Sequence, residues 1–249
     1  MTRWLSPLVA AVAVLGLWWW AVDAFRVRPF FLPSPPDILA AYRREPEYLL
    51  DELGSTLTVT TAGFVIAAVA GIVIAIALTT WRAVEHALLP LLVALNAVPK
   101  VAVAPLLVVW LGFGAPPKIV LVVLISFFPI VLASAAGLTA TPSELTELSR
   151  SLAASRWQTY AKVRLPWALP QIFVGLKVAV SLAVIGAVVA EIGNPDRGLG
   201  AVIVLSSASA DTPLAFAAIA LLALTSVTLF YTIALLERLL LPWARDITG

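Results

Sequence analysis

Six long apolar runs constrain this chain more than any other feature. A bilayer core of about 30 Å takes about 20 mostly apolar residues per helix. The runs are continuous rather than alternating, which excludes a strand barrel and requires the backbone to be paired within helices. We therefore predict an all-α membrane protein in which residues 1–249 form a single transmembrane domain. Its six predicted transmembrane helices are Leu5–Val22, Leu57–Leu78, Leu88–Phe113, Ile119–Leu138, Ile172–Ile192 and Leu214–Leu236.

Composition excludes whole classes of function. Hydrophobic residues make up 61% of the chain and charged residues 12%, whereas a soluble domain has roughly 25% charged residues. This balance excludes a soluble enzyme, a nucleic-acid binder and a disordered chain. The chain has no Cys and one His, His86, so disulfides, Cys-ligated metals and a His-based triad or metal cluster are excluded within it. We predict neither catalytic nor metal-binding residues.

The first run has two interpretations. Arg3, the apolar stretch and the small residues near Ala21 and Ala24 are compatible with a cleaved signal peptide. The run is long for such a peptide, however, and it ends in the aromatic belt Trp18–Trp20, which is typical of a membrane interface. We favour an uncleaved helix. The following segment, Asp23–Thr56, is predicted as a long loop in which Ser34-Pro35-Pro36-Asp37 begins a helix along the membrane surface.

A polar stretch, Thr139–Gln171, separates the fourth and fifth spans. Thr141-Pro142-Ser143-Glu144 and Ser155-Arg156-Trp157-Gln158 each have the pattern of a capping box. We expect a helix from Pro142 that breaks near Ala153–Ala154, and a second helix that runs from about Arg156 to Pro166. The stretch is either an ordinary surface connection or a docking segment for another protein.

Several polar residues fall inside the spans. The third span contains Asn96, Pro99, Lys100 and Pro105, and its prolines predict a kink or a re-entrant helix. An intramembrane Lys faces either a wet cavity or an interface to which it snorkels. Candidates for a translocation path are Asn96, Lys100, Lys177, Ser181 and Glu191. The fifth span is also rich in Gly and Ala, which predicts a close packing face.

No phosphate-binding Gly-rich motif occurs anywhere in the chain. We see no nucleotide site here, so if this protein is a pump, another chain must bind ATP.

The polar stretch resembles the cytoplasmic loop of bacterial ABC importer permeases. That loop reads Glu-Ala-Ala, three residues, Gly, nine residues, Ile-x-Leu-Pro. Here Glu147-Leu148-Ser149 takes the first place, Ala153 stands at the Gly position and Val163-Arg164-Leu165-Pro166 closes the pattern. The spacing matches at every step, although the Gly and two of the first three residues differ. With Ala at the Gly position, either the turn is built differently or Ala154 and Ser155 absorb the bend.

Other segments resemble the nitrate/sulfonate/taurine branch of that family, from about residue 30 to the C-terminus. They include Leu32–Pro35, Pro99–Leu106, Trp110–Gly114, Ser151–Gln158, Leu165–Pro170, Glu191 and Gly198-Leu199-Gly200.

The resemblance implies a type I ABC importer permease fold with a cytoplasmic coupling helix. It implies a homodimer in the bilayer of a bacterial inner membrane, with both termini cytoplasmic, an orientation that charge counting alone does not decide. The implied partners are two copies of an ATPase subunit, which carries ATP and Mg, and an extracytoplasmic substrate-binding protein; nucleic acid is not among them. The coupling contact would be formed by Glu147, Leu148, Ser149, Arg150, Ala153, Ala154, Ser155, Arg156, Leu165 and Pro166.

The substrate is the least constrained prediction. Lys100 and Lys177 would suit an anion such as a sulfonate, taurine or nitrate, which is the favoured hypothesis. The alternative is a vitamin precursor such as a pyrimidine. Two other classes, an intramembrane enzyme and a secondary transporter, are remote, because the chain has no Ser–His or paired Asp residues at membrane depth and no inverted repeat of broken helices.

Overall fold

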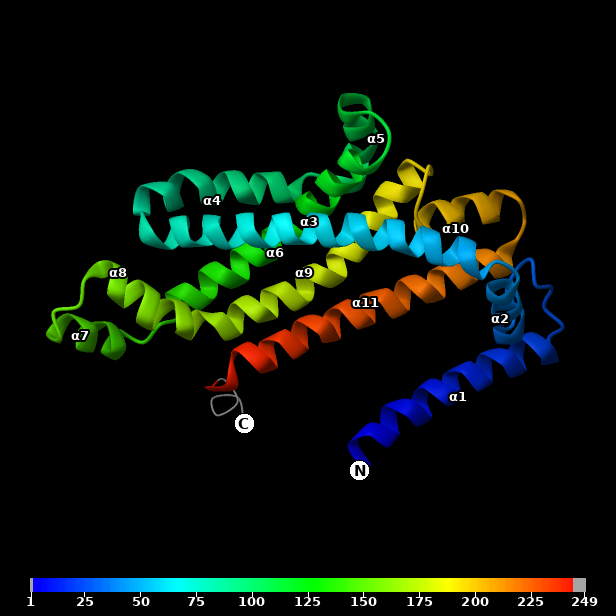
Figure 1. Ribbon diagram of the computed structural model, residues 1–249, viewed down its shortest axis with the longest axis horizontal. Coiled ribbons are helices and arrows are strands. Elements are labelled where there is room, and N and C mark those ends of the chain that lie inside the picture. Colours follow the sequence, from blue (N-terminus) through cyan, green and yellow to red (C-terminus); the bar gives the residue numbers. More distant parts are fainter. Residues whose placement is uncertain (1, 244–249) are drawn as a thin grey trace.

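The chain folds into a bundle of long helices capped by short helices at both ends (Figure 1). The computed structural model describes residues 2–243, with side chains described from residue 9, and no strand occurs in that range. The first half contains α1 (Thr2–Ala24), α2 (Pro35–Arg44), α3 (Pro46–Thr80), α4 (Arg82–Ala97) and α5 (Lys100–Leu111). α2 starts as predicted, because Ser34 and Asp37 form a capping box.

The second half contains α6 (Ala115–Thr139), α7 (Ser143–Ser151) and α8 (Arg156–Thr159). A π-helical segment, Tyr160–Arg164, leads directly into α9, and α10 and α11 complete the described chain. α7 and α8 lie at one end of the bundle, whereas α2 and α10 lie at the other (Figure 1). α9 spans Leu165–Gly193, α10 spans Leu199–Ala208 and α11 spans Thr212–Leu240.

Four stretches of the described chain are long and apolar enough to cross a membrane: α3, α6, α11 and the continuous helix Arg156–Gly193. These confirm the second, fourth, fifth and sixth predicted spans as helices of sufficient length. The third is a broken pair, α4 and α5, bent by 93°, so the predicted interruption is confirmed. The described apolar part of α1, Val9–Ala24, is shorter than these four stretches. The first predicted span begins at Leu5, whose side chain lies outside the described part of the chain.

Two predicted helix boundaries are wrong. Pro166 does not end a helix, because the chain stays helical from Arg156 to Gly193. The π turn explains this: Leu165 N donates to Tyr160 O, five residues back, and the wider turn accommodates a proline ring that would clash in a regular helix. The predicted loop Asp23–Thr56 is also too long, because α3 already begins at Pro46.

Glycines allow α6 to lie directly against α3 and α9, its main neighbours. A Cβ added at Gly63 of α3 would lie 2.5 Å from Val122 Cγ1 of α6. A Cβ added at Gly175 of α9 would lie 2.5 Å from the Cβ of Ala133. Helices in lipid associate through such close packing, since lipid offers no hydrophobic driving force between them. The small-residue face predicted on the fifth span therefore packs within this chain.

Gly175→Ala is expected to destabilise the bundle, by about 1–3 kcal/mol, because its new methyl group would overlap Ala133 and neither helix backbone can yield locally. Gly54→Ala is the matched control, since a Cβ there meets nothing within 4 Å. Thermal unfolding of the purified proteins in detergent, followed by tryptophan fluorescence, compares the two. Equal midpoints for both variants would show that the glycine contact is not limiting.

Candidate functional site

The segment α7–α8 exposes apolar side chains on an otherwise polar connection. Leu148 is 56% exposed, Leu152 73% and Trp157 74%, while Glu147 and Arg150 are exposed beside them. Exposed apolar clusters rimmed by charged groups are typical of protein contact surfaces. Ser149 faces the other way: it is buried, and its hydroxyl donates to Leu145 O at 2.8 Å.

The turn after α7 is a Schellman motif built on an alanine. Ala154 N donates to Ser149 O at 3.0 Å and Ala153 N to Arg150 O at 2.9 Å, which is the hydrogen-bond pattern of that motif. Ala153 has φ 53°, in the left-handed region. Both alternatives offered for this position are therefore wrong: the turn is of the usual kind, and Ala153 itself adopts the conformation that glycine prefers.

The second predicted capping box is confirmed and the first is wrong. Ser155 Oγ accepts from Gln158 N at 3.2 Å, and Gln158 Oε1 accepts from Ser155 N at 2.8 Å. At the first, Pro142 is the N-cap residue of α7 and no side chain caps the helix. Thr141 instead donates its hydroxyl to Leu138 O at 3.4 Å, because a threonine just after α6 reaches back to that helix end.

The loop is fixed to the ends of three long helices. Leu165 and Tyr160 pack against the buried residues Ala75 of α3, Leu138 of α6 and Ala168 of α9. Pro166 begins α9 and is half-buried, whereas Arg156 is exposed. A force on α7 and α8 therefore acts on the helices of the bundle and not on a free loop.

The predicted path residues lie in three separate places. At the break between α4 and α5, Lys100 Nζ donates to Asn96 O at 2.9 Å and to Asn96 Oδ1 at 2.6 Å. Between α9 and α11, Lys177 Nζ pairs with Glu237 Oε2 at 2.7 Å, with both side chains about one-fifth exposed. Ser181, one turn along, donates to Lys177 O at 3.5 Å. No one surface of this chain collects them.

Glu191 lies at the opposite end of the bundle and is fully buried. Its Oε2 accepts from Gly200 N at 2.8 Å, and Thr56 Oγ1 accepts from Leu199 N at 2.9 Å. Glu52 Oε2 accepts from Gly198 N. Three side chains from α3 and α9 thus satisfy the first N–H groups of α10, and the carboxylates also match the positive end of its helix dipole.

Gly198 and Gly200 are needed for this contact. A Cβ at Gly198, which has φ 105°, would lie 2.1 Å from Glu191 Cδ, and one at Gly200 would lie 2.7 Å from Glu191 Cβ. The motif Glu191…Gly198-Leu199-Gly200 is thereby explained as a helix anchor.

The sequence did not identify Glu52, Thr56 or Lys118 as buried. Lys118 is 2% exposed; its Nζ pairs with Asp196 and donates to Arg197 O at 2.8 Å. The signal was weak, since Glu52 and Thr56 fell in a predicted loop and Lys118 at the edge of a span. Two ion pairs also hold the surface of this end: Arg197 with Asp51, and Arg44 with Asp211. The hydrogen bond to Asp211 raises the pKa of the Arg44 guanidinium above its usual value.

Comparison with known proteins gives a consistent match. A model of the family described as "Binding-protein-dependent transport system inner membrane component" matches residues 63–246. The chain is 43% identical over 162 residues to the riboflavin transport system permease protein RibX of Chloroflexus aurantiacus, covering 65% of this chain and 60% of that protein. It is 35% identical to the formylaminopyrimidine transport permease protein ThiX of Halalkalibacterium halodurans, covering 91% of each chain.

It is also 30% identical to the taurine transport system permease protein TauC of Escherichia coli, covering 99% of this chain and 93% of that protein. A solved structure of an amino acid ABC transporter shares the fold, with a TM-score of 0.65 and 18% identity, over 81% of this chain and 97% of that one.

Ala153→Gly is expected to stabilise the turn after α7 by about 1 kcal/mol, because glycine adopts the left-handed conformation without strain. Ala154→Gly is the matched control: Ala154 does not have positive φ, so that change brings no relief. Hydrogen exchange at the amides of residues 152–155 measures the difference. Slower exchange in both variants, or in neither, would contradict the prediction.

Proposed function

Since the chain belongs to the family of binding-protein-dependent transport system inner membrane components, we propose that it is the permease subunit of an ATP-driven importer for a small solute. The family consists of transport permeases and not of catalytic enzymes, so the intramembrane enzyme considered above is ruled out. The observation that carries the proposal is the α7–α8 segment, which exposes Leu148, Leu152 and Trp157 while its base is packed on α3, α6 and α9.

In the proposed mechanism this segment is the coupling contact for a separate ATPase, which holds ATP and Mg. Two ATPase copies bind two permeases. Their closure on ATP pushes α7 and α8 from both sides, and the push passes into α6 and α9, the two helices that the segment joins. The loaded binding protein and ATP must favour the same conformation, since coupling is a difference in affinity between states. The permease performs no covalent chemistry.

The coupling role sets the orientation. α7, α8 and both termini would be cytoplasmic, in a bacterial inner membrane. α1 would be the first of six spans and the broken pair α4–α5 the third. α2 and α10, at the other end of the bundle (Figure 1), would then face the binding protein. The cap of Ser34, the Arg44–Asp211 ion pair and the burial of Ala41 hold α2 rigidly in place for such a contact.

A second copy is proposed to cover α4 and α5. α4 has no buried residue along its length, and on α5 the side chains of Val109 and Trp110 are 78% and 68% exposed. In the proposed orientation the break between α4 and α5 lies within the membrane, where backbone groups without helical partners are tolerated only against protein or a wet cavity. We therefore place the translocation path between two copies, beside the α4–α5 break that carries Asn96 and Lys100.

For the substrate we favour a neutral heteroaromatic vitamin or vitamin precursor. Within the described spans, Lys100 is hydrogen-bonded to Asn96, Lys118 is paired with Asp196 and Lys177 is paired with Glu237. Carboxylates thus neutralise Lys118 and Lys177, so these two lysines offer no free charge to an anion, whereas the Asn96 oxygens that hold Lys100 are neutral and leave its positive charge in place. The riboflavin and formylaminopyrimidine permeases are also more similar to this chain than the taurine permease. A small anion such as a sulfonate, taurine or nitrate is the second candidate, because the chain covers nearly all of that taurine permease.

Glu147→Lys is expected to abolish substrate-stimulated ATP hydrolysis while leaving membrane insertion intact, and Trp157→Ala to reduce the stimulation by about tenfold or more, as for loss of an aromatic anchor. Glu144→Lys, one turn earlier on the same exposed face, is the charge-matched control and should retain stimulation. The measurement is ATPase activity of the permease reconstituted with its ATPase and loaded binding protein. Normal stimulation with Glu147→Lys would remove this segment from the mechanism.

The substrate proposal has its own test. Lys100→Met and the paired change Lys177→Gln with Glu237→Gln remove charges without leaving a partner ion buried alone. Uptake into cells is measured with labelled riboflavin, formylaminopyrimidine and taurine. We expect uptake of one of the two ring compounds, with an apparent affinity that both variants leave unchanged. Uptake of taurine alone, weakened by either variant, would favour the anion.

A further inference from the structure

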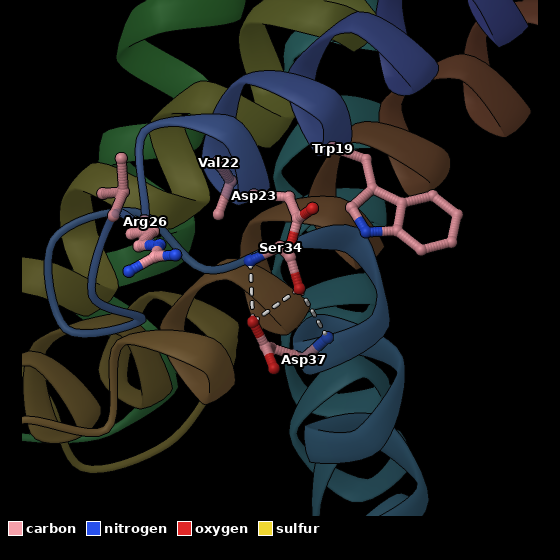
Figure 2. A pocket seen from close by; sticks show the side chains of 7 residues that line it. Trp19, Val22, Asp23, Arg26, Ser34 and Asp37 are labelled. Atoms are coloured by element: carbon pink, nitrogen blue, oxygen red, sulfur yellow. Dashed lines mark hydrogen bonds between the residues drawn. The ribbon is translucent and has the colours of Figure 1, made fainter.

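A cavity of about 230 Å³ lies where the end of α1 meets the start of α2 (Figure 2). It is open on one side and lined by side chains from both helices and the connection between them. Those residues are Trp19, Val22, Asp23, Arg26, Val27, Ser34 and Asp37. Neither the coupling contact nor the proposed path uses this cavity.

The cavity wall on the α2 side is rigid. Asp37 Oδ2 accepts from Ser34 N at 2.9 Å and from Ser34 Oγ at 2.6 Å, and Ser34 Oγ in turn accepts from Asp37 N at 3.4 Å, as the dashed lines in Figure 2 mark. The capping box therefore holds one carboxylate at a fixed position in the wall. A second carboxylate, that of Asp23 in the last turn of α1, lines the same cavity.

The basic side chain that lines the cavity belongs to Arg26, a residue with a strained backbone. Val27 N donates to Val22 O at 3.0 Å and Arg26 N to Asp23 O at 3.1 Å, so α1 also ends in a Schellman motif. Arg26 occupies its left-handed position, with φ 48°. Glycine fits there without strain, yet the chain carries its arginine at this position. Because this backbone strain is retained at a cavity wall, it indicates that the Arg26 side chain has a function there.

The surroundings place the cavity at the level of lipid headgroups. Trp19 and Trp20 on α1 are 53% and 62% exposed, and Phe25 and Phe31 in the following connection are 75% and 71% exposed. Aromatic side chains gathered at the end of an apolar helix are typical of the membrane interface. A mixed set of two carboxylates and one guanidinium at this depth complements a ligand with one positive and one negative group.

We propose that this cavity binds the phosphoethanolamine headgroup of a membrane lipid. The phosphate accepts from the Arg26 guanidinium, whose planar fork suits a phosphate. The ammonium group donates to the carboxylates of Asp23 and Asp37. A choline headgroup has no N–H donors for these carboxylates, and a glycerol headgroup has no positive charge. The site therefore selects phosphatidylethanolamine, and its occupant ties α1 to α2. This lipid assignment depends on the proposed function in one respect, namely that α1 is a membrane helix.

The experiment uses the full chain, purified in detergent, and measures its thermal unfolding while dioleoyl phosphatidylethanolamine is titrated in. We expect the midpoint to rise with this lipid and to rise less with dioleoyl phosphatidylcholine or phosphatidylglycerol. Soluble O-phosphoethanolamine forms a separate arm, in which no rise is expected at the same concentration. An equal rise with all three lipids, or with the soluble compound alone, would overturn the proposal.

Arg26→Gly separates binding from stability. It removes the phosphate contact but relieves the strained backbone, so the lipid-free protein should unfold at the same or a higher temperature. Its apparent affinity for phosphatidylethanolamine should be about tenfold weaker, as expected for one lost charge-assisted contact. Asp23→Asn should weaken binding similarly. The matched control is Ala153→Gly, which makes the same backbone change at the other end of the bundle and should keep the full lipid response.

A full lipid response in Arg26→Gly would overturn the proposal, because a purely structural Arg26 would leave lipid affinity unchanged. The readout involves neither ATP nor a transported solute. Failure here would leave the import role standing, and a normal lipid response in a protein that transports nothing would count only against the import role.

Discussion

The close contact of α6 with α3 and α9 is the constraint on which the other features depend. Gly63, Gly175 and Gly186 remove side chains where these helices meet, so the backbones approach too closely for even a methyl group at Gly63 or Gly175. Because α6 and α9 are also the helices that α7 and α8 connect, the segment that we propose as the coupling contact is carried by helices whose backbones meet closely at glycines. A looser bundle would absorb a push on that segment through local side-chain rearrangement, whereas a close-packed one passes it on as movement of whole helices.

In the described chain, polar groups at the two ends of the bundle are held by separate partners. At one end, Glu52, Thr56 and Glu191 are committed to the N-terminus of α10. Nearer the other end, Lys177 is committed to Glu237. Each of these groups has a partner within the described chain, which lowers the free energy of holding it at membrane depth. The groups exposed around the α4–α5 break are different, because their surroundings are incomplete until something covers α4. This difference is the physical reason for placing the path at a contact between two copies.

Local sequence patterns predicted the local structure well. Continuous apolar runs identified the long helices, and Ser155–Gln158 fixed the start of α8, because both signals depend on residues within a few positions of one another. The errors came from long-range or competing interactions. Pro166 failed to end a helix because a π turn makes room for it. Glu52 was not identified as buried because its partner Gly198, 146 residues along the chain, meets it only after folding. Nothing local in the sequence announces such a contact.

Three helix ends show how the same backbone motif serves different surroundings. Arg26, Ala153 and Ala210 all have positive φ, and each closes a Schellman motif by the hydrogen bonds after α1, α7 and α10. At Ala153 the side chain is only a methyl group, which leaves Leu148 and Trp157 unobstructed for a partner on the same exposed surface. At Arg26 the side chain is long and charged and lines a cavity. Since the backbone would favour glycine at both positions, the side chain present calls for an explanation in its surroundings: at Ala153 the exposed surface that we propose as the coupling contact, and at Arg26 the cavity that we propose for a lipid headgroup.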